Sequence, residues 1–487
     1  MFSKLLTFIR TVIHKLIPYN TIESVEKIET PLSSEMATAL DKWYDMYRDK
    51  SPWLAAPGMK SLALAPFVCS EIARQVTLEM KWNITGKGKV NKDGDPVMNP
   101  RAEYLTNEFQ KCVDKLREKL EQGCAAGGMV IKPYVKGEHI YFDWTMDWSL
   151  YPIAFADDGM LSDVIFRDTY TEGKTIYSRL ERHTRDGKNV KITQRAFKST
   201  LRDTIGTEVP LSAVPSWKDL PPEATVTAAD GQLFGWYRVA SANHVDVDSP
   251  MGASVFAKAC DAIRDADEQY SRLMWEFEGS ELAIDVDPTV LRPKKGENGK
   301  EEMPRLNERL FRAVDRGTDD SYDIFSPAIR DTSLINGLNQ VLTRVEDLCG
   351  LARGTLTEAP AVARTATELN ILKNRSYATI ADNQKRLEVC LREVIHAMDR
   401  YATIYKLAPE GEYEVSFEWD DSIITDTDQQ LNERLTLLNA NIASRAEIRE
   451  WYYGETPSQA KAAIAAADEE RMNLMLGMEK LMPQVTP

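Results

Sequence analysis

Two segments of this chain carry apolar residues at a spacing of three or four positions. They cover residues 252–283 and 332–352. This spacing places the apolar side chains on one face of a helix. The first stripe consists of Val255, Ala259, Ile263, Ala266, Tyr270, Leu273 and Phe277, and the second of Leu334, Leu338, Val341, Val345 and Leu348. We therefore predict two amphipathic helices that bracket a polar insertion like the legs of a hairpin.

A polar insertion and a small-residue loop lie next to these helices. The insertion, residues 284–331, contains KKGENGKEE, whose glycines predict a hairpin or an exposed loop. The loop, residues 353–364, runs into RTATELN, which opens a long helix of about residues 365–405. Thr365 and Glu368 have the spacing of a capping box, in which each side chain bonds the other residue's backbone N–H. A helix of about 40 residues spans roughly 60 Å, so part of it must pack outside a single small core.

The chain before the hairpin changes from a helical to a strand-like pattern. Helical periodicity is present at residues 33–50, 59–83 and 101–122. From about residue 125 to 240, β-branched and aromatic residues between turn signals predict strands, apart from an irregular stretch at 200–232. After the long helix, residues 412–425 alternate like a strand and residues 427–487 predict further helices. The sequence therefore predicts an α+β protein.

Charge and cysteine content narrow the functional classes. The chain has 60 basic and 75 acidic residues, a net charge of −15, which argues against a protein whose main task is to coat phosphates. The first striped helix is especially acidic, because residues 252–291 hold three basic and nine acidic side chains. The six cysteines form no CxxC pair, so they predict neither a disulfide framework nor a zinc site and suit a reducing cytoplasm. No apolar run reaches the roughly 18–20 residues of a membrane span.

The N-terminal segment predicts an amphipathic helix within residues 1–30. Its apolar side chains fall on one broad face and its basic side chains largely on the other. Charges inside the apolar run, and Pro18-Tyr19 in place of a small-residue cleavage site, argue against a signal peptide. This helix could pack on its own protein or on a neighbouring subunit, or it could contact a membrane surface.

The sequence predicts no nucleotide-binding, metal or catalytic site. Gly173-Lys174-Thr175 matches the end of a phosphate-binding P-loop, but Asp168 occupies the position of the earlier glycine and the flanks are strand-like. His244, Asp246 and Asp248 alternate and could share one face of an extended segment as metal ligands, although a polar edge without metal fits two isolated carboxylates better. We predict no catalytic residue, no cofactor and no metal site.

The order of these parts, rather than a single motif, resembles the portal, or head-to-tail connector, proteins of long-tailed bacteriophages. It runs from the β-rich block through SPMGASVFAKACDAIRDADEQY, the polar insertion, the second striped helix and the small-residue loop to TATELN, the long helix, the alternating strand and SRAEIREWYYG. The resemblance covers about residues 50–455. It implies a ring at one capsid vertex, typically a dodecamer, with double-stranded DNA passing through its central channel during packaging and ejection.

The resemblance also implies a mainly helical portal fold with distinct parts. These are an N-terminal arm (1–30), a wing of helices and then strands (31–248), the first stem helix (249–283), a clip (284–331), the second stem helix (332–352), a tunnel loop (353–364), a long wing helix with a wing strand (365–426) and a C-terminal helical crown (427–487). The clip would face the packaging motor and later the tail adaptor. The tunnel loop would project toward the DNA.

Candidate functional residues follow from these parts and their charges. Acidic stem side chains would repel the phosphates and let DNA slide, and the lining candidates are Asp261, Asp265, Glu268 and Glu276. In the tunnel loop the candidates for DNA contact are Arg353, Thr355, Thr357 and Arg364, although the two arginines could equally pair with carboxylates of the stem or of a neighbour. Candidates for partner binding by the clip are Lys294, Lys295, Glu297 and Lys300. Thr365 and Glu368 would serve only as helix caps.

The resemblance also gives the expected partners and location. The partners are further copies of the chain, double-stranded DNA bound without regard to sequence, the terminase large subunit, the head-tail adaptor, and the major capsid and scaffold proteins. The location is the portal vertex of the virion capsid, after assembly in the host cytoplasm. Two other classes are a nucleotide-driven packaging enzyme, which the missing P-loop disfavours, and a helical scaffold or membrane-associated assembly protein, which the β-rich block fits poorly.

Overall fold

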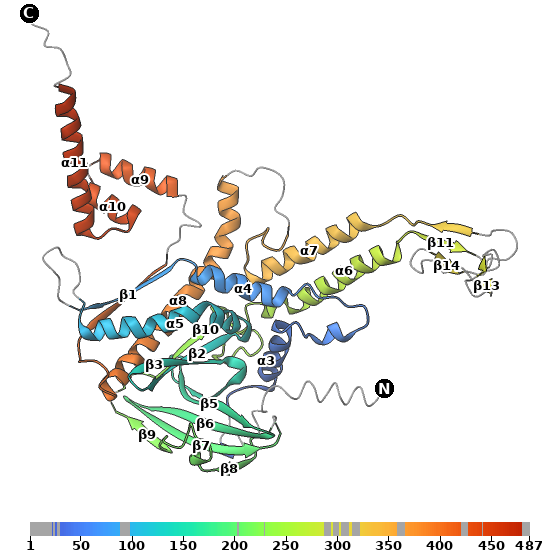
Figure 1. Ribbon diagram of the computed structural model, residues 1–487, viewed down its shortest axis with the longest axis horizontal. Helices are drawn as coiled ribbons and strands as arrows, with labels where there is room; N and C mark the ends of the chain where they lie inside the picture. Colours follow the sequence, from blue (N-terminus) through green and yellow to red (C-terminus); the bar gives the residue numbers. More distant parts are fainter. Residues whose placement is uncertain are drawn as a thin grey trace, which may run out of the picture. The chain divides into compact units, whose positions relative to one another are not determined.

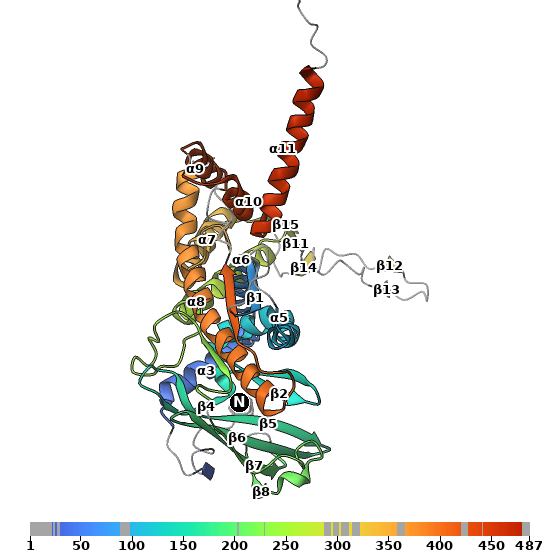
Figure 2. The ribbon, with the colours of Figure 1, turned by 90° about the vertical axis from the view of Figure 1, so that its left-hand side faces the viewer.

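The computed structural model divides the chain into two compact units. The first contains residues 1–44, 69–255 and 364–487, and the second contains residues 45–68 and 256–363. The fold is a mixture of helices and strands, so the predicted α+β class is confirmed (Figures 1 and 2). The structure describes residues 22, 25–26, 30–87, 98–201, 204–227, 229–286, 294–295, 301–302, 311–313, 322–357, 366–419, 427–440 and 442–479.

A six-stranded antiparallel sheet forms the largest part of the β-rich block in the first unit. Its strands are β4 (Leu150–Phe155), β5 (Leu161–Glu172), β6 (Thr175–Asp186), β7 (Asn189–Ser199) and β8 (Thr207–Val209), with β9 (Glu223–Val226) also paired to β7. Glu172 lies opposite Thr175 in the β5–β6 register, and the turn between them begins at Gly173 with a φ of 60°. The Gly-Lys-Thr sequence is therefore a hairpin turn, which confirms that it is not a P-loop.

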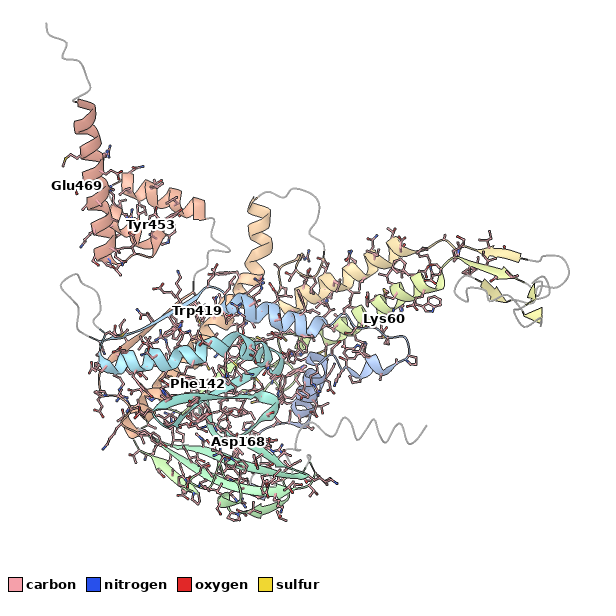
Figure 3. All side chains as sticks on the ribbon, viewed as in Figure 1. Lys60, Phe142, Asp168, Trp419, Tyr453 and Glu469 are labelled. Atoms are coloured by element: carbon pink, nitrogen blue, oxygen red, sulfur yellow. The ribbon has the colours of Figure 1, made fainter. Side chains whose placement is uncertain are left out.

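Two smaller sheets and two long helices complete the core of the first unit. The strands are β10 (Gly235–Arg238), β2 (Gly128–Lys136) and β3 (His139–Met146) in one sheet, and β1 (Met80–Gly86) with β16 (Tyr413–Trp419) in the other. The helices α5 (Pro100–Ala126) and α8 (Ala366–Ile404) lie against them. Phe109 of α5 packs edge-on against Trp82 of β1 and Phe417 of β16, at ring-centroid distances of 5.0 and 6.4 Å. Trp419 ends β16 (Figure 3).

The two ends of α5 fix its place in this core. Asn99 caps the first turn by accepting a 2.8 Å hydrogen bond from the Ala102 N–H. At the other end Gly127 has a φ of 92°, and a Cβ there would lie 2.5 Å from the carbonyl oxygen of Gly252. Only glycine permits this approach, because the positive φ is strained for other residues and no space remains for a side chain. The segment that leads toward the first striped helix is thereby held against the end of α5.

Several shorter helices flank these elements. Near the N-terminal side are α3 (Ser34–Tyr47) and α4 (Leu64–Thr77), and the C-terminal part consists of α9 (Thr427–Asn439), α10 (Arg445–Tyr453) and α11 (Pro457–Glu479). Ser444 and Glu447 form a complete capping box at the start of α10, with distances of 3.2 and 2.8 Å (Figure 3 labels Tyr453 at its end). Among the described residues, no helix is both long and apolar enough to span a membrane.

The second unit is built on a pair of antiparallel helices with small sheets at one end. Its helices are α6 (Cys260–Gly279) and α7 (Asp331–Cys349), and its strands are β11 (Ala283–Val286), β12 (Lys294–Lys295), β13 (Glu301–Glu302), β14 (Phe311–Ala313) and β15 (Tyr322–Phe325). β11 pairs in parallel with β14 and antiparallel with β15. β12 and β13 pair antiparallel, which confirms the predicted hairpin. Both striped segments are thus helices that bracket a strand-rich insertion.

Two predicted boundaries are wrong. The helix predicted at 59–83 is α4 followed by strand β1, because Trp82 and Ile84 alternate and lie opposite Phe417 and Val415 of β16. The first striped helix begins at Cys260 rather than at 252, since the residues before it carry the Gly252 contact with Gly127.

Only the end of the predicted N-terminal arm falls among the described residues. Ile22 is fully buried in an apolar cluster with Ile165, Leu180 and Phe197 of the six-stranded sheet. Glu26 forms a 2.9 Å ion pair with Arg195. This end of the arm therefore packs on its own chain, while residues 1–21 lie outside the described part.

Candidate functional site

The hairpin of α6 and α7 has an apolar interior supplied mostly by the two predicted stripes, although Phe277 of the first stripe is 41% exposed and the buried Leu342 takes the place predicted for Val341. Its buried members are Ile263, Ala266 and Leu273 in α6, and Leu338, Leu342 and Val345 in α7. The two helices contact each other along their length (Figure 1). At 1.5 Å per residue, helices of 19 and 20 residues extend for about 30 Å each. The hairpin is therefore a rod with two distinct ends.

At the end next to the small sheets, Glu276 and Arg330 clamp the helices together. The Glu276 carboxylate accepts hydrogen bonds from the backbone N–H, Nε and a terminal nitrogen of Arg330, at 3.2, 3.0 and 2.7 Å. These bonds with Arg330 lower the pKa of Glu276. The Glu276 side chain is 9% exposed. Glu276 therefore does not present a free carboxylate, and we withdraw it from the predicted acidic lining.

The other three lining candidates lie exposed on α6 but close to arginines. The side chains of Asp261, Asp265 and Glu268 are 81%, 54% and 41% exposed. Arg264 lies 3.9, 3.5 and 4.0 Å from these three carboxylates, and Arg272 lies 3.8 Å from Glu268. Three carboxylates and two guanidinium groups leave this face with only one uncompensated negative charge. The repulsion that α6 could exert on phosphates is smaller than the sequence count suggests.

At the other end of the hairpin, the buried Glu346 of α7 holds the root of the following loop. Its Oε1 atom accepts hydrogen bonds from the backbone N–H groups of Gly354, Leu356 and Thr357, at 3.1, 2.6 and 3.1 Å. The Thr357 hydroxyl adds a contact of 3.3 Å. Hydrogen bonds to an ionised acceptor are stronger than neutral ones, and a buried carboxylate requires them. One side chain therefore fixes residues 354–357 to the helix.

The remaining loop candidates have modest local roles. Arg353 pairs with Asp347 at 3.1 Å, and this pair raises the pKa of Arg353. Arg353 thus pairs with a carboxylate of α7, which is one of the alternatives stated for it above. The Thr355 hydroxyl donates to the carbonyl of Ala352 at 2.6 Å. Arg364 and Thr365 lie outside the described residues and Glu368 lies in the first turn of α8, so their roles stay predictions.

In the insertion, two of the clip candidates lie in the strand β12, which pairs with β13. Lys294 lies opposite Glu302 and Lys295 opposite Glu301 across the β12–β13 pair. Glu297 and Lys300 lie outside the described residues.

Sequence reasoning missed a segment that packs on α6 within the second unit. Asp267 accepts 2.9 Å hydrogen bonds from Trp53 Nε1 and from the Leu62 N–H, and Ser271 Oγ accepts one of 2.8 Å from the Lys60 N–H. Burial raises the pKa of Asp267, and the two hydrogen bonds act in the opposite direction. The polar residues Asp267 and Ser271 adjoin the apolar stripe of α6, but no local pattern shows a partner about 210 positions away.

No grouping of possible metal ligands is present in the part of the chain that the structure describes, where no three His, Cys, Asp or Glu side chains converge. The six cysteines are all buried and unpaired with each other. Burial raises the pKa of Cys112, Cys124, Cys349 and Cys390, so these thiols are poor nucleophiles.

The comparisons with known proteins identify the family of the chain. A family model described as phage portal protein, SPP1 Gp6-like, matches residues 81–473, which is most of the chain. No curated protein matches the sequence. The matched region includes α6, the insertion, α7, α8 and most of the C-terminal helices. The chain therefore belongs to the SPP1 Gp6-like phage portal proteins, structural proteins of the virion that form the DNA channel at a capsid vertex and dock the packaging motor and then the tail adaptor.

Proposed function

We propose that the second unit of this portal protein is its stem and clip, and that the loop after α7 is the tunnel loop. In this assignment α6 and α7 form the stem and residues 284–331 form the clip. The long helix α8 and the strands of the first unit form the wing, and α9 to α11 form the crown. Twelve copies would surround the double-stranded DNA, assembled in the host cytoplasm together with scaffold and major capsid proteins.

The observation that carries this assignment is the pair of different ends on one helical rod. One end leads into the short strands β11 to β15, and the other leads into a loop whose root is fixed by Glu346. A channel protein needs both features. The strand-rich end offers a surface for the terminase large subunit and then the head-tail adaptor, and the opposite end holds a loop beside the DNA path.

Glu346 gives this loop a defined starting direction. Its carboxylate replaces solvent for three backbone N–H groups, so residues 354–357 are ordered before any DNA is present. A loop rooted in this way transmits a displacement of α7 to its distal part. We therefore assign Glu346 a positioning role in DNA passage, without direct contact with DNA.

The test of this role is the Glu346→Gln variant, with Asp347→Asn as the matched control. Glutamine keeps an acceptor oxygen but loses the charge, so we expect faster amide hydrogen exchange at residues 354–357 and a lower yield of packaged DNA, with rings still formed. Asp347 pairs with the exposed Arg353, whereas the N–H groups of Gly354, Leu356 and Thr357 donate to Glu346, so the Asp347 variant should leave both readouts unchanged. Slow exchange at 354–357 and normal packaging in Glu346→Gln would contradict the positioning role.

A further inference from the structure

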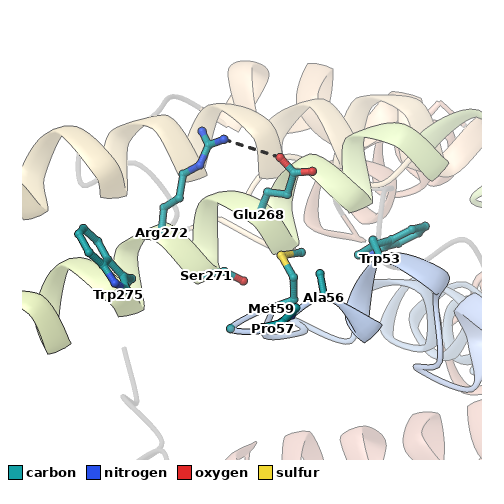
Figure 4. Close-up of a pocket in the computed structure, with 9 residues that line it drawn as sticks. Trp53, Ala56, Pro57, Met59, Glu268, Ser271, Arg272 and Trp275 are labelled. Carbon is teal, nitrogen blue, oxygen red and sulfur yellow. Dashed lines mark ion pairs between the residues drawn. The ribbon is translucent and has the colours of Figure 1, made fainter. Parts of the chain in front are cut away.

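A pocket of about 440 Å³ lies on the exposed face of α6 within the second unit. Figure 4 shows its lining, in which α6 contributes Trp275, Arg272, Ser271 and Glu268, with Arg272 and Glu268 joined by their ion pair. The segment that packs on α6 contributes Trp53, Ala56, Pro57, Gly58 and Met59. The hydrogen bonds of Asp267 and Ser271 described above hold it on the helix. The pocket is therefore a built feature of the stem and not a gap between mobile parts.

The chemistry of this face is that of a protein interface. Trp275 is 66% exposed, and the half-buried and exposed side chains around it include a methionine, a proline and an arginine. Tryptophan, methionine and arginine are enriched where proteins meet, and exposed apolar clusters mark such sites. Duplex DNA hides its bases, so an indole on a sliding surface would gain nothing from stacking. We expect this face to be covered by protein.

Because α6 and α7 are antiparallel, the start of each helix lies at the same height along the hairpin as the end of the other. Cys260, at the start of α6, lies near Cys349, at the end of α7. Glu276, near the end of α6, bonds Arg330, just before α7 begins. Interpolation along the helices places Trp275 level with residues 330–335, and Asp261 and Asp265 level with the last two turns of α7, where Arg344 lies.

Matching groups for the α6 face occur on α7 at these same levels. At the level of Trp275, Ile329 and Ile335 are 47% and 40% exposed. At the level of Asp261 and Asp265, Arg344 is exposed and has no ion-pair partner among the residues that the structure describes. Rotation about a ring axis parallel to the stem leaves the height of each residue unchanged. In a ring with this axis, the apolar groups of α7 therefore lie at the same height as the pocket of a neighbouring copy, and Arg344 lies at the same height as its carboxylates.

We propose that α7 of the next copy in the ring docks on the α6 face, with Ile335 entering the pocket beside Trp275 and Arg344 pairing with Asp261 and Asp265. This inference rests on the proposed stem. It is a head-to-tail interface, which closes a ring when the same contact repeats around the axis. Asp261 and Asp265 then form contacts between subunits, and other residues of the stem line the channel.

Photocrosslinking from position 275 tests the interface directly. Trp275 is replaced by the photoreactive amino acid benzoylphenylalanine, purified rings are irradiated, and crosslinked peptides are identified by mass spectrometry. We expect a product of twice the chain mass that joins position 275 to a peptide within residues 326–344 of another copy. Crosslinks only within one chain, or only to other segments of a neighbour, would overturn the interface.

A charge exchange gives a second measurement that does not depend on the tryptophan. Arg344→Glu alone should raise the protein concentration at which half the subunits are in rings by about fivefold, and Asp265→Arg alone should do the same. The two changes in one chain should restore assembly, because the pair is re-formed with reversed sign. Failure of the double variant to recover would contradict the proposed pairing.

The outcomes separate this inference from the assignment of the stem. Rings with an axial channel but without the predicted crosslink and charge rescue would overturn the interface and leave the portal assignment in place. Purified protein that forms no ring under any assembly condition would overturn both.

Discussion

The proposed wing, in the first unit, and the proposed stem, helices α6 and α7, use charged residues in opposite ways. In the wing sheet the Glu181 side chain is 12% exposed. Its carboxylate forms ion pairs with Lys132 at 2.9 Å and Arg179 at 3.1 Å, and it contacts the His183 ring nitrogen at 2.8 Å. Arg179 also pairs with Asp168, which lies on the same sheet (Figure 3). In the stem, Arg264 and Arg272 meet their carboxylates at 3.5 to 4.0 Å, on side chains that are 41–81% exposed.

This difference separates charges that fix the fold from charges available to a partner. The members of the wing cluster find their ion-pair partners within one chain, and Lys132 and His183 are only 5% and 0% exposed. Removing one member of such a buried set weakens the charge compensation of the others. The stem pairs are long and solvated, so they contribute little to folding and remain free to exchange partners. The comparison implies that stem variants affect assembly before they affect stability.

The largest effect is expected for Glu181→Gln in the wing. The variant leaves the buried Lys132 with Asp143 alone, at 3.6 Å, and Arg179 with Asp168 alone, so the free energy of unfolding should fall toward the lower end of about 3–5 kcal/mol. Chemical denaturation measures it. The neighbouring Lys191→Ala, whose ion pair with Glu223 is exposed, is the matched control and should change little. A loss below about 1 kcal/mol for Glu181→Gln would erase the distinction between wing and stem.

A second wing prediction concerns pH. Burial raises the pKa of Asp147 to about 7 and of Glu393 to about 7, and both accept hydrogen bonds from Trp236, at 3.3 and 3.2 Å. For a carboxyl whose pKa is higher in the folded state, the folded protein binds more protons between the two pKa values. Its contribution to stability is therefore present below about pH 4, declines as the pH rises and is lost above about pH 7.

Asp147→Asn removes one of these two titrations. Relative to the wild type, the variant should gain stability with rising pH, by about 1.4 kcal/mol for each pH unit between about 4 and 7, and by nothing further above that range. Unfolding measured at pH 5, 6, 7 and 8 gives this difference. A difference that is constant across these pH values would show that Asp147 does not titrate in this window.

The smallest effect on stability is expected in the stem. Arg272→Ala removes a 3.8 Å pair between side chains that are 63% and 41% exposed, and should change the free energy of unfolding by less than about 1 kcal/mol. A larger loss in denaturation would mean that the stem charges fix the fold as those of the wing do.

The elements that the sequence predicts well are those whose pattern is local. Both stem stripes, the strands from 128 to 199 and the long helix α8 have a periodicity that needs no knowledge of distant partners. Strand β1 was missed because its stability comes from β16, more than 300 residues later. The capping box at Ser444 and Glu447 also follows a local pattern, a serine followed three residues later by glutamate, and could have been predicted.

The site was harder to predict than the fold, for a physical reason. The sequence shows which side chains are acidic, but not that Glu276 binds Arg330 or that Arg264 lies among three carboxylates. Glu346 sits among apolar stripe residues of α7, and its function depends on three backbone N–H groups of the following loop. The number of acidic residues in a helix therefore overestimates the negative electrostatic field at the surface of that helix.

A reconstruction of the purified protein by single-particle electron microscopy tests the central claim most directly. We predict closed rings in which the α6–α7 hairpin of every copy lies along an axial channel wide enough for duplex DNA. The strands β11 to β15 should lie at one end of the stem and the loop after α7 at the other. Rings in which this hairpin lies on the outer surface, or particles without an axial channel, would contradict the account.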